Sequence, residues 1–491
     1  MRTDSWRSLV GGAMAGGLLL ATAAGQSPAP GTASAGAARG QEGCLEWRGD
    51  RTGRFPDAQP PLEFGPDRNV IWKMTMPHWS NASPVIVGDR LFVCAELDTL
   101  MCIRLSDGML LWQRTTNPFD LKEPSMSPEE AARERKELER HDQIDRQIQL
   151  LRDAIKAAGT VRPTTPPAED ADDAADPGDA PLPAAASDAA RLAQLQAEYK
   201  TLARFHRGTK GLAIGKSCCT PVSDGKHVYV IFGDAMASCF DLDGNRKWIT
   251  TVVQNPKKNT YASPVLIGDK LILCIDITVY ALDKNTGETL WTAQASYKGD
   301  SMGDYRNNAP GHARVGGVDL IITPVVDVFR ASDGKQLAAG IGKCNCVTVH
   351  EDVAYCGGTA FRLAITSPEV LEVTTLWKSR GAGHASPLVH DGLAYLVGIS
   401  GDVTVVEAAT GKGVYHQNTG LTRETYTSPT LAGEYIFIAD EKGTFVVFKA
   451  GRQYQEVARM SLGEKIRSCP VFLGKRMFVR GLDTLYCFGQ E

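Results

Sequence analysis

The sequence lacks a basic excess: its 53 lysines and arginines are outnumbered by 57 acidic residues, and the formal net charge is −4. A nucleic-acid-binding chain needs a clustered basic excess, so we expect no nucleic-acid partner. The common catalytic motifs Gly-x-Ser-x-Gly, His-Glu-x-x-His and the P-loop are also missing. Past the N-terminus no apolar run approaches the length that spans a bilayer, which predicts a chain without a membrane anchor.

The N-terminus has the parts of a secretory signal. Arg2 and Arg7 form a basic region, residues 9–21 are apolar, and small residues that suit cleavage follow. We therefore expect residues 1–25 to be a signal peptide that directs export through the general secretion pathway, to the periplasm or out of the cell. Residues 26–43, rich in Pro, Ala and Gly, are expected to be a disordered linker.

One phrase recurs along the chain and marks a structural repeat. It reads Ala-Ser-Pro-Val-Ile-Val-Gly-Asp in residues 82–89 and Ala-Ser-Pro-Val-Leu-Ile-Gly-Asp in residues 262–269. The proline of the phrase, or the residue in its slot, marks eight units: Pro84, Pro221, Pro264, Pro310, Val347, Pro387, Pro429 and Pro470. From the second unit on, the marks recur about every 40 residues, a period typical of propeller blades or solenoid units.

Each unit predicts four short strands. The inner strand starts at the Ser-Pro, and Gly-Asp or Thr-Gly turns separate the strands that follow, since glycine accepts the positive φ of tight turns. The last unit ends at Phe488 after its third strand, while Val70-Ile-Trp-Lys73 supplies an unassigned fourth strand near the other end of the chain. Joining the two would close a ring and protect its sheet edges. We therefore predict an all-β fold: an eight-bladed β-propeller of four-stranded blades, closed by an N-terminal strand.

A further motif carries a family resemblance. Residues 281–291 read Ala-Leu-Asp-Lys-Asn-Thr-Gly-Glu-Thr-Leu-Trp. They match the tryptophan-docking motif of PQQ-repeat propellers at every specified position: Ala281, Asp283, Thr286, Gly287 and Trp291. The opening Trp47-Arg-Gly-Asp-Arg-Thr-Gly53 is similar to the lead-in of the PQQ-like propellers that planctomycete genomes carry in many copies. The resemblance implies either a quinoprotein dehydrogenase that holds PQQ and calcium, or a non-catalytic relative such as the propeller subunit of outer-membrane barrel assembly.

An insertion at residues 117–210 interrupts the repeat, which leaves residues 44–116 and 211–491 for the propeller. Ser127-Pro-Glu-Glu is typical of a helix start. Apolar residues then follow at helical spacing in two stretches: Leu138, Ile144, Ile148, Leu151 and Ile155, then Leu192, Leu195, Tyr199 and Leu202. Residues 161–187 between them are rich in Pro, Ala and Asp and are expected to be disordered. We predict an antiparallel, coiled-coil-like hairpin, either a solvent-exposed decoration or a docking arm for another protein.

The cysteines are more simply explained by the repeat than by disulfides, although twelve of them in an exported chain first suggest disulfides. In the third strand Cys102, Cys239 and Cys487 share the slot of Ala281, and in the second strand Cys94, Cys274 and Cys356 share another. Free cysteine at such buried positions behaves as a small apolar residue. A vicinal Cys218–Cys219 disulfide and a zinc site among the inner-strand cysteines remain weaker alternatives. The inner-strand cysteines belong to blades too far apart to share an ion easily: Cys218, Cys219, Cys344, Cys346 and Cys469.

The resemblance places any site at the mouth of the channel, just before and within the inner strands. The candidate ligand-binding residues at those positions are mostly basic: His78, Lys216, Tyr261, Lys343, His384, Arg423, Tyr426, Lys465 and Arg467. Basic side chains converging on one funnel would attract an anionic ligand, and Arg423 and Arg467 could grip a carboxylate. The alternative is a set of solvated residues around a water-filled channel, balanced by Glu424 and Glu464.

A PQQ enzyme needs more, including a Glu–Asn–Asp set for calcium and an aspartate base. Channel-side asparagines are present, but the sequence places no carboxylate with them: Asn81, Asn259, Asn307, Asn308 and Asn345. We therefore name no catalytic and no metal-binding residue and expect no cofactor, with PQQ and calcium as the alternative. The leading interpretation is a monomeric, exported, non-catalytic scaffold for a protein partner or a small anionic ligand. The alternative is a PQQ-dependent dehydrogenase that oxidises alcohols or sugars.

Overall fold

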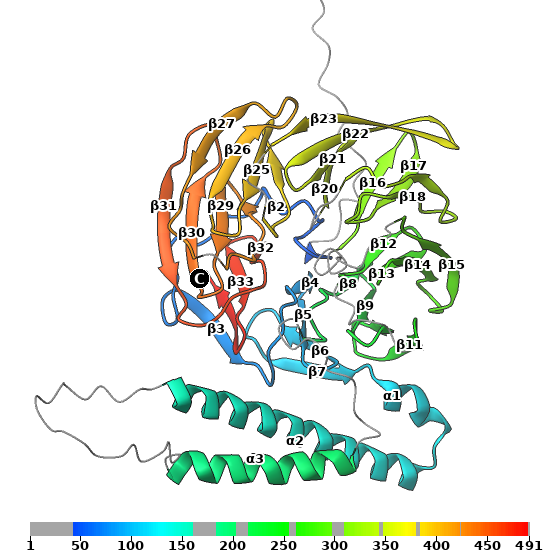
Figure 1. Ribbon diagram of the computed structural model, residues 1–491, viewed down its shortest axis with the longest axis vertical. Coiled ribbons are helices and arrows are strands. Elements are labelled where there is room, and N and C mark those ends of the chain that lie inside the picture. Colours follow the sequence, from blue (N-terminus) through cyan, green and yellow to red (C-terminus); the bar gives the residue numbers. More distant parts are fainter. Residues whose placement is uncertain are drawn as a thin grey trace, which may run out of the picture. The chain divides into compact units, whose positions relative to one another are not determined.

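The computed structural model describes residues 43–160, 183–202, 215–254, 262–296, 309–342, 347–379, 383–422 and 424–489. Their strands form eight sheets arranged around a common centre (Figure 1). Each of eight buried apolar clusters joins two neighbouring sheets, so the core lies between the blades. The predicted eight-bladed β-propeller of four-stranded blades is confirmed.

In blades 1 to 7 the strands follow one another in chain order from the channel outward, and in blade 8 the outermost strand is β3, from the start of the chain. Blades 1 to 4 are β4 (Val85–Val87), β5 (Arg90–Ala95), β6 (Thr99–Arg104) and β7 (Leu110–Thr115); β8 (Val222–Ser223), β9 (His227–Ile231), β10 (Met236–Asp241) and β11 (Arg246–Thr251); β12 (Val265–Ile267), β13 (Lys270–Ile275), β14 (Thr278–Asp283) and β15 (Thr289–Gln294); and β16 (Gly311–Val315), β17 (Val318–Ile322), β18 (Val328–Arg330) and β19 (Gln336–Ala338). Blades 5 to 8 are β20 (Val347–His350), β21 (Val353–Cys356), β22 (Thr359–Ser367) and β23 (Val370–Lys378); β24 (Leu388–His390), β25 (Leu393–Val397), β26 (Val403–Glu407) and β27 (Gly413–Gln417); β28 (Thr430–Ala432), β29 (Tyr435–Ala439), β30 (Thr444–Lys449) and β31 (Glu456–Ser461); and β32 (Val471–Leu473), β33 (Arg476–Arg480), β34 (Thr484–Phe488) and β3 (Val70–Thr75). Every inner strand begins at the predicted proline slot or directly after it.

The two ends of the chain share blade 8. β3 pairs antiparallel with β34, with Trp72 opposite Cys487 and Thr75 opposite Thr484. The predicted closure of the ring is confirmed. β3 supplies the fourth strand of blade 8, so the outer edge of β34 is paired.

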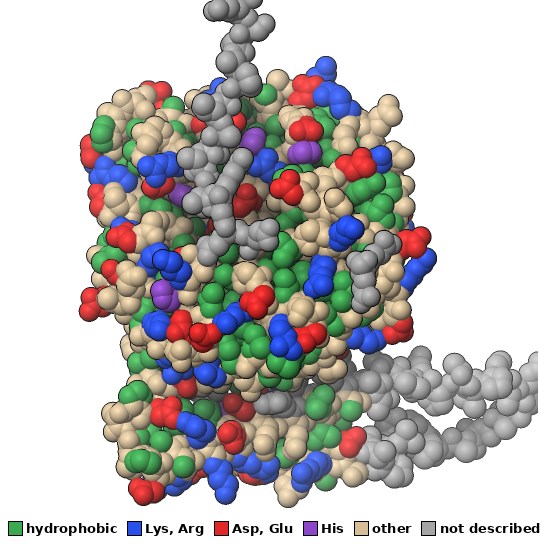
Figure 2. All heavy atoms as spheres, turned by 180° about the vertical axis from the view of Figure 1, so that it is seen from behind, with side chains coloured by type: hydrophobic (Ala, Val, Ile, Leu, Met, Phe, Trp, Pro, Cys, Tyr) green, Lys and Arg blue, Asp and Glu red, His purple; other side chains and the backbone are tan. Residues whose placement is uncertain are grey.

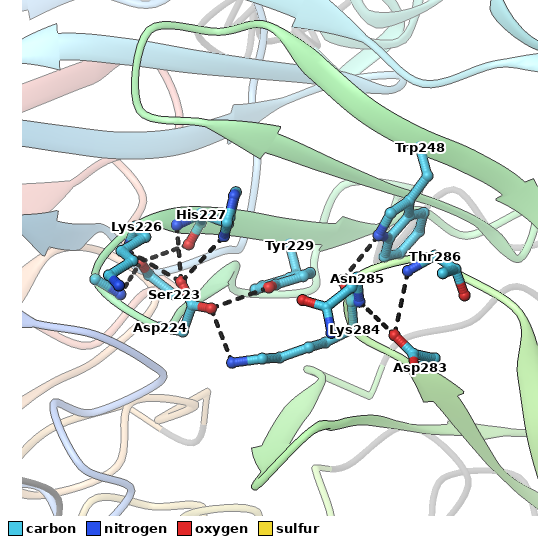
Figure 3. A network of polar contacts seen from close by, with 11 residues as sticks. Ser223, Asp224, Lys226, His227, Tyr229, Trp248, Asp283, Lys284, Asn285 and Thr286 are labelled. Carbon is cyan, nitrogen blue, oxygen red and sulfur yellow. Dashed lines mark hydrogen bonds and ion pairs between the residues drawn. The ribbon is translucent and has the colours of Figure 1, made fainter.

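Tryptophans of outer strands join neighbouring blades. Trp248 of blade 2 lies on Gly287 of blade 3, and its indole Nε1 donates to the carbonyl oxygen of Lys284 at 2.8 Å (Figure 3). Gly287 has φ +76°, and a Cβ added there would lie 2.7 Å from Cε3 of Trp248, so glycine is required under the ring. The same dock recurs at four other junctions: Trp72 on Gly108, Trp112 on Gly244, Trp291 on Gly334 and Trp377 on Gly411.

The third-strand cysteines stand opposite these tryptophans, as alanine does in the full motif. Ala281 pairs with Trp291, and three cysteines pair in the same way: Cys102 with Trp112, Cys239 with Trp248 and Cys487 with Trp72. Burial raises the pKa of Cys102 and of Cys487 to about 12, so these thiols stay protonated and fill space as small apolar groups. Cys218 is half-buried and Cys219 is buried at the start of blade 2.

A belt of hydrogen bonds that was not predicted from the sequence runs along the channel wall at the Ser-Pro level, from blade 6 through blades 7, 8, 1 and 2 to blade 3. The backbone amide of the residue before the proline donates to the side chain of the equivalent residue in the next blade. The described links are Ser83 N to Thr220 Oγ1 (3.1 Å), Thr220 N to Ser263 Oγ (3.0 Å), Ser386 N to Ser428 Oγ (2.9 Å), Ser428 N to Cys469 Sγ (3.3 Å) and Cys469 N to Ser83 Oγ (3.0 Å). A small polar side chain in this slot thus satisfies a buried amide that no sheet partner reaches.

The insertion is helical. It contains α1 (Pro118–Lys122), the 3₁₀ turn η1 (Glu123–Ser125), α2 (Pro128–Thr160) and α3 (Pro183–Thr201). α2 and α3 lie side by side (Figure 1), share a core and run antiparallel, with Arg140 Nε 2.7 Å from Glu198 Oε1. α3 starts inside the stretch 161–187 that we expected to be disordered, because proline suits the first turn of a helix and alanines follow it. Residues 161–182 lie outside the described residues.

The expected signal peptide and all but the last residue of the expected linker also lie outside the described residues. Gly43, the last residue assigned to that linker, belongs to β1 (Gly43–Cys44). Within the described part of the chain, no helix combines the length and the apolar character that a membrane span requires.

Candidate functional site

A segment to which the sequence analysis gave no structural role lies inside the channel. β1 pairs with β4, the innermost strand of blade 1, and β2 (Arg54–Phe55) pairs with β28, the innermost strand of blade 7. Between them the carbonyl oxygen of Leu45 accepts a 2.8 Å hydrogen bond from Ser223 N of blade 2. A stretch that bonds to the innermost strands of blades 1, 2 and 7 lies inside the channel. We call residues 43–59 the channel segment.

The tip of the channel segment carries two arginines that reach other blades. Arg48 is 0% exposed, its Nη2 donates to the carbonyl oxygen of Pro429 at 2.7 Å, and its Nη1 lies 3.4 Å from that of Pro387. Nη2 of Arg51 donates to the carbonyl oxygen of Pro310. The three carbonyls belong to blades 7, 6 and 4 and stand where the inner strands begin. The two guanidinium groups therefore lie across the channel at that level.

Gly53 lets the backbone turn tightly against Arg48. It has φ +77°, and a Cβ added there would lie 2.2 Å from Nη2 of Arg48. The chain then runs back: Leu431 N donates to Gly53 O, and Gln59 N donates to the carbonyl of Gly474, in the turn after β32, both at 2.8 Å. The channel segment thus enters and leaves where the inner strands end, and its tip points toward the opposite opening, which we call the mouth.

Four of the predicted site residues gather at the mouth, on blades 6 to 8. The rings of His384 and Tyr426 lie 6.0 Å apart, and the guanidinium of Arg467 lies 5.9 Å from the centre of the Tyr426 ring. Tyr426 is 41% exposed, so much of its ring is open to a ligand. Lys465, also exposed, lies two residues before Arg467 and completes the group.

Glu441 is the acidic partner of this group, and the sequence analysis missed it. Its Oε1 accepts a 2.8 Å hydrogen bond from Nε of Arg467 and lies 3.9 Å from Nζ of Lys465. Burial alone would raise the pKa of Glu441, but Arg467, a hydrogen bond with Glu424 and the charge of Lys465 together outweigh it and lower that pKa. The carboxylate is ionised and takes up part of the charge of Arg467. Glu464, the partner we expected, instead accepts the amides of Asp483 and Thr484.

The other predicted residues do not join this group within the described structure. Lys216 is only 3% exposed, because the chain turns inward there and Glu96 Oε1 accepts its backbone amide at 2.7 Å. His78 lies beside blade 8, where its carbonyl oxygen accepts from Nη2 of Arg480 at 2.6 Å. Three further candidates lie outside the described residues: Tyr261, Lys343 and Arg423.

PQQ and calcium do not fit the described residues. These residues contain no group of three or more His, Cys, Asp or Glu side chains placed to hold a metal ion. Arg467, which could bind a quinone carboxylate, is engaged by Glu441, and the tip of the channel segment occupies the channel just below the mouth. We therefore derive no reaction step through this cofactor.

Charge is mixed over the face of the molecule drawn in Figure 2, where basic and acidic side chains are interspersed. Such a surface does not provide the one-sided basic field that nucleic acid requires. Attraction of an anion would therefore be local and would depend on groups such as Lys465.

Comparisons with known proteins agree with this architecture. The family model described as outer membrane protein assembly factor BamB matches residues 64–301. No curated protein sequence matches the chain. BamB from Moraxella catarrhalis is similar in structure, with 11% identity, a TM-score of 0.54, and coverage of 86% of this chain and 99% of that one.

Two enzymes have similar structures. A europium-containing methanol dehydrogenase shows 10% identity and a TM-score of 0.55, with coverage of 91% of this chain and 98% of that one. The quinohemoprotein alcohol dehydrogenase from Comamonas testosteroni shows 11% identity and a TM-score of 0.53, with coverage of 92% and 81%. At such identities the likeness shows the fold alone.

Proposed function

Because this chain is a PQQ-repeat β-propeller, we propose that it acts as an exported, non-catalytic scaffold that recognises an anionic group at the mouth of its channel. The group belongs either to a protein partner, as a side-chain or terminal carboxylate, or to a small ligand. The assembly-factor family that matches residues 64–301 supports a protein partner.

The observation that carries the proposal is the group at the mouth. Lys465 offers an exposed ammonium, Tyr426 an exposed ring, and His384 a second ring beside it. A carboxylate would pair with Lys465 while its carrier packs on the rings. Arg467 contributes less, since Glu441 already shares its charge.

A photo-crosslinking experiment tests the proposal. A photoreactive residue replaces Lys465 at the mouth or, as control, Lys475, an exposed lysine of the same blade in the turn at the other end of the channel. We expect crosslinks in the native compartment from position 465 and not from position 475. Calorimetry then measures binding of glutamate and of an acidic peptide to the purified protein and to the Lys465→Glu variant. Binding of glutamate indicates a small ligand, and binding of the peptide alone indicates a protein partner. Equal crosslinking from both positions, with no anion binding, would contradict the proposal.

A PQQ-dependent dehydrogenase is the second candidate, because two alcohol-oxidising enzymes are built on the same fold. Adding PQQ with calcium to the purified protein tests it directly. Bound-quinone absorbance together with dye-linked oxidation of an alcohol or sugar would establish the enzyme and overturn the scaffold.

A further inference from the structure

We propose that the central channel is a guanidinium-binding site and that the channel segment is its built-in ligand. The observation is the pair of arginines at the tip of the channel segment, which bond to carbonyl oxygens of blades 4, 6 and 7. The inference concerns the depth of the channel and is independent of the anion recognition proposed at its mouth.

The wall of the channel at this level is built from hydrogen-bond acceptors. Proline has no N–H, so the slot contributes a carbonyl and no donor in blades 4, 6 and 7, where Pro310, Pro387 and Pro429 occupy it. The amide of the preceding residue is also used, because it donates within the belt, as Ser386 N does to Ser428 Oγ. The carbonyl oxygens of Pro310, Pro387 and Pro429 thus form a collar of acceptors around the channel segment, which favours a cation that carries many N–H groups over an anion.

Guanidinium fits this collar better than ammonium does. It presents five N–H donors in a planar fork, whereas lysine offers one compact centre. Arg48 uses the fork across three blades: Nη2 reaches Pro429 O at 2.7 Å, and Nη1 lies 3.4 Å from Pro387 O and 3.5 Å from Thr348 Oγ1. Thr348 in turn donates to Pro387 O at 2.7 Å, which ties the acceptors of blades 5 and 6 together.

The consequence is a channel occupied by its own chain. The channel segment is anchored at both ends by strand pairing, with Gly43 opposite Val87 and Phe55 beside Ala432. A soluble ligand that enters at the mouth would contact the tip of the channel segment, with Arg48 and Arg51, because this tip fills the channel below. Binding at the mouth is therefore confined to the rim.

Hydrogen exchange on the full-length protein tests the inference. We expect the amides of residues 43–59 to exchange as slowly as those of the inner strands. Arg48→Met, which keeps an unbranched apolar stem and removes the N–H donors, should speed exchange in this segment by about tenfold or more and lower the midpoint of thermal unfolding by about 5 °C. Arg48→Lys should resemble Arg48→Met, while Arg68→Ala, at an exposed surface arginine, should leave both quantities unchanged.

Chemical rescue distinguishes a guanidinium site from simple loss of packing. In an Arg48→Ala variant, millimolar methylguanidinium should restore slow exchange in residues 43–59, and methylammonium at the same concentration should not. If Arg48→Ala does not fold, the comparison of Arg48→Met with Arg48→Lys still decides. Fast exchange of this segment in the wild type, full protection in Arg48→Lys, or equal rescue by the two cations would overturn the inference.

Discussion

The backbone amide of Cys469, in the last blade, donates a 3.0 Å hydrogen bond to the hydroxyl of Ser83, in the first. It carries the belt across the seam from blade 8 to blade 1, and within blade 8 Trp72 of β3 lies opposite Cys487 of β34. One contact holds the seam beside the channel, and the other holds it at the outer edge. These two contacts join segments near the two ends of the chain. Variants at the seam therefore test how far the stability of the ring depends on its closure.

Replacing Ser83 by alanine should weaken the seam. The buried amide of Cys469 loses its acceptor, and an unsatisfied buried donor costs about 1–2 kcal/mol of unfolding free energy. Denaturant unfolding measures the loss, and Ser461→Ala, at an exposed serine, is the control. An unfolding free energy of Ser83→Ala equal to that of the wild type would show that this hydrogen bond does not stabilise the propeller.

The tryptophan dock makes a sharper prediction, because the chain offers a matched control. Gly287 and Gly268 both have positive φ, but a Cβ at Gly287 would lie 2.7 Å from Cε3 of Trp248, while nothing lies within 4 Å of one at Gly268. Gly268→Ala should cost about 1 kcal/mol for its backbone conformation. Gly287→Ala should cost about 2 kcal/mol more, since the indole must move. Equal losses in urea unfolding would show that Trp248 is not held on the glycine.

A third prediction concerns acid stability at the junction of blades 2 and 3 (Figure 3). Nζ of Lys284 lies 2.9 Å from Oδ2 of Asp224, which also accepts from Tyr229 OH at 3.1 Å. Burial raises the pKa of Asp224, but the hydrogen bonds from Lys284 and from two backbone amides outweigh it and bring the pKa to about 2. A lowered pKa means that folding favours the ionised form. The stabilisation is therefore present above about pH 4 and is lost as the pH falls toward 2.

Asp224→Asn should accordingly lower the unfolding free energy at pH 7 by about 1–2 kcal/mol, and this difference should shrink between pH 4 and pH 2. Urea titrations at pH 7, 4 and 3 measure it, with Asp89→Asn at an exposed aspartate as control. A difference that stays constant with pH would mean that Asp224 acts through packing and not through its charge.

The features that could be predicted from the sequence are those that the chain repeats. The repeated Ser-Pro slot predicted the start of every inner strand, and the tryptophan strand around Trp72 predicted where the ring closes. Each prediction could be checked against the other copies of the repeat. The channel segment has no copy in the chain, and Arg48 meets Pro387 and Pro429 far along the sequence, so no local pattern announces these contacts.

Two further features of the structure could not be predicted from the sequence, for the same reason. Lys216 occupies the expected slot, but the turn of the backbone toward Glu96 buries it, and the spacing of residues does not reveal that turn. The strands of the β22–β23 hairpin have nine residues each and are longer than the short strands we expected. Its Glu369 reaches back to Arg330 of blade 4, at 2.8 Å, across a junction whose outer strand β19 carries no tryptophan. At this junction an ion pair between Arg330 and Glu369 stands where other junctions have a tryptophan on a glycine, and the sequence alone does not reveal this exchange.

The inserted arm should be separable from the propeller if it is cut at the right place. Its hairpin has a core of its own, formed by Ile144, Ile148 and Leu195. α1 is different: the carboxylate of its Asp120 accepts from Asn117 N and from Thr115 Oγ1, both at 3.0 Å, and lies 3.5 Å from Nη2 of Arg246 in blade 2.

We therefore expect two deletions to behave differently. Replacing residues 126–202 by a short Gly-Ser linker, with Phe119→Ser because Phe119 loses its contact with Leu138, should leave the thermal midpoint of the propeller within about 2 °C of the wild type. Replacing residues 117–210 also removes Asp120 and should cost about 1–2 kcal/mol more, since Arg246 loses its buried partner. Far-UV circular dichroism reports the loss of helix in both variants. Collapse of the shorter deletion would make the arm part of the propeller core, and equal stability of the two would show that α1 does not brace blade 2.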